Sequence, residues 1–72
     1  MNIDHLKDKF DLNELEVSLL EYIKKNQKRL KNITIRQMAK DNFTSTSAIY
    51  RLCNKLEFSG YSDMIYHLSS NT

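Results

Sequence analysis

Six polar side chains recur between residues 45 and 56 at a spacing that places them on one side of a helix. At 100° of rotation per residue they share one half of the circumference, and they are Thr46, Ser47, Tyr50, Arg51, Asn54 and Lys55. They supply hydroxyl, phenol, amide and cationic groups without a carboxylate. Such groups form hydrogen bonds with base edges and phosphate oxygens, so the pattern indicates contact with nucleic acid.

The opposite half of the same segment is apolar and indicates a helix that lies against a core. This half carries Ala48, Ile49, Leu52, Cys53 and Leu56. We interpret Cys53 as a small buried hydrophobic residue and not as a reactive thiol. A helix that is merely solvated usually mixes both charge signs on its polar face, and this one does not.

The sequence lacks the residue pairs that catalysis or metal binding requires. His5 and His67 have no nucleophile or metal-ligand companion at a useful spacing, and the single cysteine forms no internal disulfide. The single glycine, Gly60, excludes a glycine-rich phosphate loop. We therefore predict no enzymatic activity, no cofactor and no bound metal.

Basic residues are concentrated in the middle of the chain. The net charge is +2, yet residues 22–40 carry seven Lys or Arg and no acid, whereas residues 1–21 carry six acids and two lysines. A basic stretch of this kind is expected in a protein that binds phosphates. The alternative is a solvated helix end, because Lys and Arg also complement the dipole at a helix C-terminus.

Length and composition favour a single small helical domain. The chain has 72 residues, 40% of them hydrophobic and 28% charged, with one Gly and no Pro. So few turn formers argue against an all-β fold, and no apolar run approaches the roughly 18 residues of a membrane span. The N-terminus also lacks the pattern of a signal peptide. We expect an all-α bundle of about five helices in the cytoplasm, without membrane contact.

Apolar periodicity and capping residues divide the chain into short helices. The expected helical segments are residues 3–10, 13–25, one turn within 26–33, 34–41, 45–56 and a last helix from Ser62. The apolar stripe of the second segment is Leu12, Leu15, Leu19, Leu20, Tyr22 and Ile23. Two capping boxes are expected, one formed by Asn13 and Glu16 and the other by Thr34 and Gln37. Ser45 and Ser62 are expected to cap the last two helices.

The segments 34–41 and 45–56, joined by a tight turn, form a helix-turn-helix arrangement. In this motif the second helix enters the major groove of DNA, and its N-terminal half meets the base edges. The expected base contacts are Thr46, Ser47, Tyr50 and Arg51. The expected phosphate contacts are Thr34, Arg36, Gln37, Ser45, Lys55 and part of residues 24–31. The alternatives are that the cations are simply solvated and that Tyr50 covers the turn.

The segment from Ala39 to Asp63 resembles the N-terminal domain of the RpiR family of bacterial transcriptional regulators. The matching positions are Ala39, Thr44, Ser45, Arg51, Leu52, Cys53, Lys55, Leu56, Phe58, Gly60 and Tyr61. The upstream helices follow the family's layout as well, so the resemblance spans nearly the whole chain. It implies a homeodomain-like helix-turn-helix domain that binds double-stranded DNA in a bacterial cytoplasm. It further implies control of genes of sugar or amino-sugar metabolism.

Two positions depart from the family pattern. Glu57 and Phe43 stand where the family usually or often has glycine. A left-handed backbone at either residue costs about 1–2 kcal/mol. We therefore expect a local rearrangement of the turn, in which Asn42 takes the unusual dihedral angle.

The resemblance also implies how the domain is used. In the family it precedes a sugar-isomerase-type domain that binds phosphorylated sugars, so we expect residues 1–72 to be an N-terminal fragment and the effector to bind outside it. Operators of this motif class are commonly palindromic, so we expect a homodimer. The candidate pairing residues are Ile3, Leu6, Phe10, Met64 and Leu68. The alternative function is a helical protein–protein interaction module without DNA binding.

Overall fold

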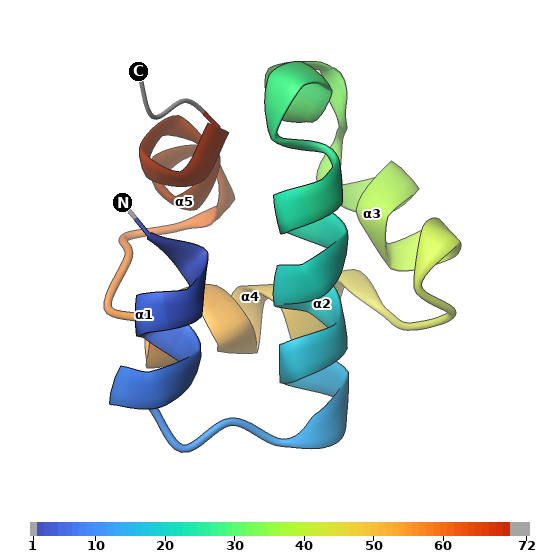
Figure 1. The fold of residues 1–72 in the computed structure, drawn as a ribbon. Helices are drawn as coiled ribbons and strands as arrows, with labels where there is room; N and C mark the ends of the chain where they lie inside the picture. Colours follow the sequence, from blue (N-terminus) through green and yellow to red (C-terminus); the bar gives the residue numbers. More distant parts are fainter. Residues whose placement is uncertain (1, 70–72) are drawn as a thin grey trace.

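The computed structural model describes residues 2–69, which form an all-α bundle (Figure 1). Its helices are α1 (Ile3–Lys9), α2 (Glu14–Lys25), the 3-10 helix η1 (Gln27–Asn32), α3 (Ile35–Asp41), α4 (Thr46–Lys55) and α5 (Tyr61–Ser69). The predicted fold class and the order of the helices are therefore confirmed. Within this part of the chain, every helix is too short or too polar to cross a membrane.

Side-chain caps begin the two N-terminal helices. The Asn2 side chain accepts a hydrogen bond from the Asp4 backbone N–H at 2.9 Å. At the start of α2, Asn13 Oδ1 accepts from the Glu16 N–H at 2.8 Å, and Glu16 Oε1 accepts from the Asn13 N–H at 2.9 Å. This reciprocal pair is a complete capping box, as its spacing predicts.

The start of α3 has half of the predicted capping box. Thr34 Oγ1 accepts a hydrogen bond from the Gln37 N–H at 3.1 Å. The Gln37 side chain does not return to the Thr34 backbone, because its Nε2 donates to Asp41 Oδ1 at 2.6 Å. The prediction that Gln37 completes the box is therefore wrong, and its amide links the two ends of α3 instead.

The last two helices begin in different ways. Ser45 Oγ accepts from the Ala48 N–H at 3.2 Å and caps α4, as predicted. The prediction that Ser62 caps the last helix is wrong, because α5 begins at Tyr61 and Ser62 lies inside its first turn. The Asp63 carboxylate accepts from the Ser59 N–H at 3.0 Å, so it satisfies a backbone donor ahead of α5.

The core lies between all six helices and contains the whole predicted apolar face of α4. Ile49, Leu52 and Cys53 are completely buried, and Ala48 and Leu56 are nearly so. Long-range hydrogen bonds fasten η1 and the residue after it to α5. Gln27 Nε2 donates to the Leu68 carbonyl at 2.8 Å, and the Tyr61 hydroxyl donates to the Ile33 carbonyl at 2.6 Å. These two bonds join segments 41 and 28 positions apart and help to hold the bundle together.

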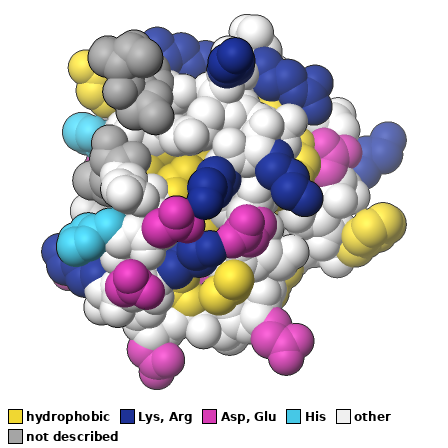
Figure 2. All heavy atoms as spheres, viewed as in Figure 1, with side chains coloured by type: hydrophobic (Ala, Val, Ile, Leu, Met, Phe, Trp, Pro, Cys, Tyr) yellow, Lys and Arg dark blue, Asp and Glu magenta, His cyan; other side chains and the backbone are white. Residues whose placement is uncertain are grey.

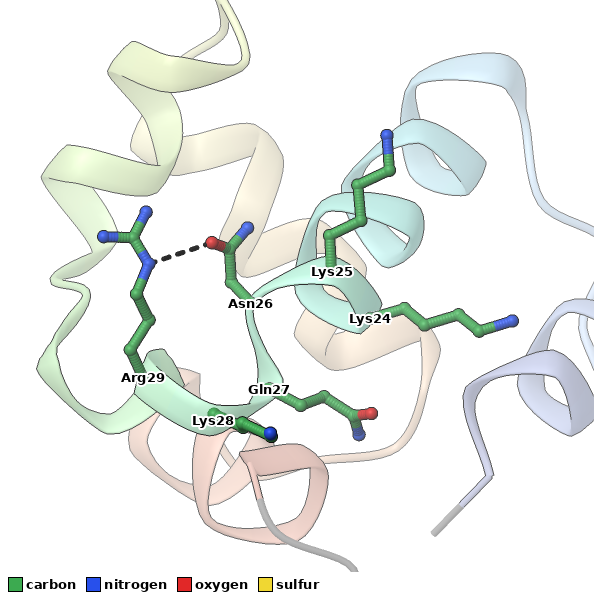
Figure 3. Close-up of a pocket in the computed structure, with 6 residues that line it drawn as sticks. All are labelled: Lys24, Lys25, Asn26, Gln27, Lys28 and Arg29. Atoms are coloured by element: carbon green, nitrogen blue, oxygen red, sulfur yellow. Dashed lines mark hydrogen bonds between the residues drawn. The ribbon is translucent and has the colours of Figure 1, made fainter.

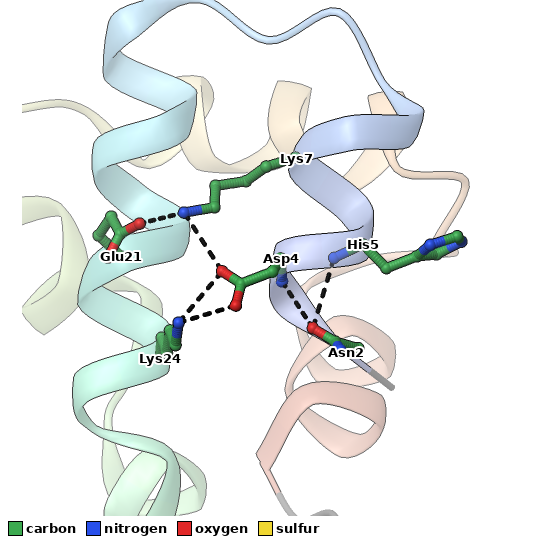
Figure 4. Close-up of polar contacts among 6 residues, drawn as sticks. All are labelled: Asn2, Asp4, His5, Lys7, Glu21 and Lys24. Carbon is green, nitrogen blue, oxygen red and sulfur yellow. Dashed lines mark hydrogen bonds and ion pairs between the residues drawn. The ribbon is translucent and has the colours of Figure 1, made fainter.

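Polar contacts fasten α1 to α2 on one side of the molecule (Figure 4). Lys24 Nζ lies 2.9 Å from Asp4 Oδ2, and Lys7 pairs with Asp4 and Glu21. Lys24, and then Lys7, hold the pKa of Asp4 below its ordinary value, and Lys7 does the same for Glu21. Exposed ion pairs of this kind add little stability. The attachment of α1 therefore depends mainly on its apolar residues.

The burial of those apolar residues contradicts the prediction that they form a dimer surface. Ile3, Leu6, Met64 and Leu68 are buried within this domain, with at most 4% of their surface exposed. Phe10 is half-buried and packs against the same core. Ile3, Leu6, Met64 and Leu68 fill the core of one copy of the chain, so these four are not available to pair with a second copy.

Two tight turns place non-glycine residues in the left-handed region. Phe43, after α3, has φ of 54°, and Glu57, after α4, has φ of 70°. Asn42 has an ordinary φ of −108°, so the predicted rearrangement does not occur. After α3 the Phe43 N–H donates to the Lys40 carbonyl at 3.2 Å and the Thr44 N–H to the Ala39 carbonyl at 2.9 Å.

This double hydrogen bond is a Schellman motif, in which the first residue beyond the cap is usually glycine. The turn after α4 repeats it. There the Glu57 N–H donates to the Asn54 carbonyl at 3.0 Å and the Phe58 N–H to the Cys53 carbonyl at 2.9 Å. The hydrogen bonds hold each turn although the conformation costs about 1–2 kcal/mol.

Glycine at either position is expected to stabilise the protein. Phe43→Gly and Glu57→Gly should each raise the free energy of unfolding by about 0.5–1 kcal/mol, because relief of strain exceeds the entropy cost of glycine. Urea denaturation followed by circular dichroism measures this change. Asn42→Gly is the control and should lower stability, because Asn42 has a negative φ and its Nδ2 binds the Met38 carbonyl at 2.8 Å. Equal destabilisation by all three variants would contradict the left-handed geometry.

Candidate nucleic-acid interface

The solvent face of α4 is the polar half that its sequence predicts. Ser47, Arg51 and Lys55 are exposed, and Thr46 is half-buried at the start of the helix. Tyr50 is 49% exposed, so about half of its surface is accessible to a ligand on this face. The base-contacting residues predicted from the sequence therefore do share one accessible surface, and the role of each in binding stays a prediction.

This surface differs in its charge from the side of the molecule that α1 and α2 form. On the side of α1 and α2, acidic and basic side chains are intermingled, and Lys and Arg gather at the edge formed by η1 (Figure 2). The solvent face of α4 carries hydroxyl, phenol, amide and cationic groups from its first residue to its last, with no acid. A helix face that contributes no carboxylate of its own offers hydrogen-bond donors to phosphates.

Lys55, at the end of α4, is paired inside the domain. Its Nζ lies 2.9 Å from Glu16 Oε1, a carboxylate that also caps α2. Burial opposes ionisation of Glu16, but the Asn13 N–H and Lys55 together outweigh that effect and hold its pKa below the ordinary value. The positive charge of Arg51 adds to this in a minor way. Lys55 is therefore partly neutralised before it meets a phosphate.

A second acid lies among the residues predicted to contact phosphate. Asp41, at the end of α3, accepts from Gln37 and from the Tyr22 hydroxyl, at 2.6 Å and 2.5 Å. The Tyr22 hydrogen bond is the main reason that the pKa of Asp41 lies below its ordinary value. Burial, and then Asp41, raise the pKa of Tyr22 to about 12. Gln37 is committed to this network, whereas Arg36 is exposed and has no ion pair within residues 2–69.

Sequence reasoning missed Glu16, Asp41 and Tyr22 as neighbours of the candidate surface. Glu16 and Lys55 are 39 positions apart, and Tyr22 and Asp41 are 19 apart. The spacing of Glu16 from Asn13 indicated only a capping box. Nothing in the helical pattern indicated that Glu16 would also pair with a lysine of a distant helix. These contacts depend on how α2 packs against α3 and α4.

The capping hydroxyls keep a hydrogen-bond donor for a ligand. Thr34 Oγ1 and Ser45 Oγ each accept one backbone N–H. A hydroxyl that accepts a hydrogen bond still carries its own O–H, which can donate to a phosphate oxygen. Both residues are exposed. Their predicted role is compatible with their capping role.

An open hollow of about 420 Å³ lies beside η1 in the basic stretch (Figure 3). It is lined by Lys24, Lys25, Asn26, Gln27, Lys28 and Arg29. Arg29 Nε donates to Asn26 Oδ1 at 3.0 Å, and Lys24 is paired with Asp4. Within the described part of the chain, Lys25, Lys28 and Arg29 form no ion pair. Together with Lys31, which is exposed and also without an ion pair, they are the cations of residues 24–31 that are free to meet phosphates.

Cys53 faces the core. It is fully buried, burial raises its pKa to about 11, and its Sγ lies 3.7 Å from Met64 Sδ. A buried thiol that stays protonated packs as a small hydrophobic residue, as predicted. Among residues 2–69, no three His, Cys, Asp or Glu side chains are grouped to hold a metal ion.

The arrangement of α3, turn and α4 agrees with a comparison against protein-family models. The model of the helix-turn-helix domain of the rpiR family matches residues 2–72. The chain belongs to the rpiR family of helix-turn-helix domains. Comparisons with curated proteins and with solved structures found no match.

Membership in this family indicates what the candidate interface binds. The rpiR-family helix-turn-helix domain is a DNA-binding regulatory domain and not a catalytic one. The resemblance read from Arg51, Gly60 and Tyr61 is thereby confirmed over almost the whole chain. In this rpiR-family domain the solvent face of α4, with the adjoining residues of α3, is the candidate DNA surface.

Proposed function

We propose that this chain binds double-stranded DNA in a sequence-specific manner as part of a bacterial transcriptional regulator. In this proposal α4 lies in the major groove, which is wide enough for one α-helix. The residues that meet base edges are Thr46, Ser47, Tyr50 and Arg51. The observation that carries the proposal is the acid-free solvent face of α4, held in place by a buried opposite face.

Phosphate contacts flank the reading face. They come from Thr34, Arg36, Gln37, Ser45, Lys55 and the free cations beside η1. Arg36 supports this assignment most directly, because it is exposed and without an acidic partner among residues 2–69. Lys55 and Gln37 would first have to exchange Glu16 and Asp41 for phosphate. We therefore rank Arg36 above both as a phosphate ligand.

The regulator acts in the bacterial cytoplasm as a homodimer on genes of sugar or amino-sugar metabolism, as the family resemblance implies. A dimer on a palindromic operator places two copies of α4 about one helical turn of DNA apart. The pairing surface lies outside the buried residues Ile3, Leu6, Met64 and Leu68.

Selection of bound sequences from random duplex DNA tests the proposal. The expected result is one recovered motif, with mirrored half-sites if two copies bind together. Binding to the selected duplex is then measured at several salt concentrations, because neutralised phosphates make the affinity fall steeply as salt rises. A chain that enriches no sequence and binds no duplex would be a protein–protein module instead.

Lys55→Ala is expected to weaken binding to all duplexes about equally. It should lower the slope of log affinity against log salt by about 0.9, the contribution of one phosphate contact. Lys7→Ala is the matched control, since it also removes one ion-paired lysine and one positive charge, on α1. A loss confined to the selected sequence, with the slope unchanged, would give Lys55 a role in base recognition.

A further inference from the structure

Phe43 is the most exposed large hydrophobic side chain among residues 2–69. Its surface is 97% exposed, compared with 70% for Tyr66 and 49% for Tyr50. It belongs to the turn between α3 and α4, which projects from one end of the bundle (Figure 1). Its backbone is also in the left-handed region, which a residue with a Cβ rarely adopts. An aromatic ring at this position contributes nothing to the core and strains the turn.

The turn holds Phe43 in a defined place. The N–H groups of Asn42, Phe43 and Thr44 all donate to carbonyls of the last turn of α3. The Asn42 side chain adds a further bond, from Nδ2 to the Met38 carbonyl at 2.8 Å. The position of the Phe43 backbone is therefore set by the end of α3 and does not depend on the ring.

A strained residue whose large apolar side chain is also almost completely exposed calls for a functional explanation. Phe43 lies two positions before the cap of α4 and three before Thr46. Three residues span at most about 11 Å, which is about three base-pair steps of B-DNA. With α4 in the major groove, a ring this close to Thr46 would be within range of a base step next to those read by the first turn of α4.

We propose that the Phe43 ring contacts the 5-methyl group of a thymine at the edge of the major groove. This inference rests on the proposed function and adds an apolar contact to the polar reading face of α4. Thymine is the base that presents a methyl group in the major groove, and phenylalanine is among the apolar residues that contact it. The ring carries no charge and no hydrogen-bonding group, so a phosphate or a base amide is a poor partner for it. Phe43 thus selects a thymine beside the bases read by Thr46 and Ser47.

The test combines a protein variant with a chemical change in the DNA. The wild-type chain and Phe43→Gly are titrated with the selected duplex and with duplexes in which each thymine in turn is replaced by deoxyuridine, which lacks the methyl group. Phe43→Gly relieves strain and should fold at least as well as the wild type, so a loss of affinity is not a loss of structure. Glu57→Gly relieves the same strain elsewhere and is the control, which should bind at least as tightly as the wild type because it also removes an acid two positions after Lys55.

We expect Phe43→Gly to weaken binding roughly fourfold, the effect of one lost methyl-sized contact. One deoxyuridine position should weaken the wild type to the same extent and leave the variant unaffected. Equal affinities of the wild type and Phe43→Gly would overturn the inference. It would also be overturned if the variant were weaker but responded to every deoxyuridine as the wild type does, because the ring would then contact deoxyribose.

The experiment distinguishes a failure of this inference from a failure of the proposed function. A wild-type chain that binds the selected duplex with steep salt dependence supports the proposed function whatever Phe43 does. A wild-type chain that binds no duplex overturns both. In that case the exposed ring would belong to a protein contact.

Discussion

Leu52→Ala is expected to lower the free energy of unfolding by about 2–5 kcal/mol, the usual cost of this truncation in a packed core. Leu52 lies on α4 and is completely buried. A 72-residue domain has a total stability of roughly 4–11 kcal/mol, so the variant loses a large part of it. Because α4 carries the reading face on its other side, DNA binding should fall with the folded fraction.

Arg51→Ala is the matched control for this result. Arg51 is the sequence neighbour of Leu52 and lies on the solvent face. Its loss should change the free energy of unfolding by less than about 0.5 kcal/mol, as expected for an exposed site, and should still weaken DNA binding. Urea denaturation and DNA titration of both variants separate the two faces of α4. A Leu52→Ala change below about 1 kcal/mol would contradict the packing of this helix.

Ser47→Ala and Tyr50→Ala are each expected to cost about 1–3 kcal/mol of binding free energy at one operator position. Both side chains project from the acid-free face, and neither fills the core. Non-specific binding should remain nearly unchanged, because that binding comes from phosphate contacts. Sequence selection with each variant measures the preference directly, since a lost contact relaxes the requirement at one position.

Tyr66→Ala provides the control for Tyr50→Ala. Tyr66 is an exposed tyrosine on α5, with 70% of its surface accessible. It should keep the wild-type sequence preference, because it does not belong to the helix-turn-helix. If both Ser47→Ala and Tyr50→Ala also kept it, the solvent face of α4 would not be the surface that reads the bases.

The sequence by itself determined the helices and the two faces of α4. The capping box of Asn13 and Glu16 and the Ser45 cap join residues three positions apart, so local sequence contains all that they need. The division of α4 into a buried and an exposed half follows from one rotation of 100° per residue. The resemblance at Arg51 and Gly60 then indicated the family without any tertiary information.

The same local reasoning failed where several faces of one helix compete for the core. In α2 the stripe predicted that Leu15 is buried, yet Leu15 is 36% exposed and its neighbour Glu16 is 9% exposed. The periodicity of an amphipathic helix defines an apolar side but not its edges. Which edge residue is covered depends on the neighbouring helices, and here Lys55 of α4 lies over Glu16.

Only the tertiary structure decided the partners of the charged groups and the availability of the apolar ones. Lys55 pairs with Glu16 and Asp41 binds Tyr22 because packing brings α2 against the ends of α4 and α3. Ile3 and Leu68 are apolar, as residues of an interface often are. The sequence pattern of an apolar stripe does not distinguish a stripe that packs on its own core from one that packs on a second chain. The left-handed conformation of Phe43 is held by local hydrogen bonds to the last turn of α3, but only the structure showed it, because phenylalanine itself does not favour that conformation.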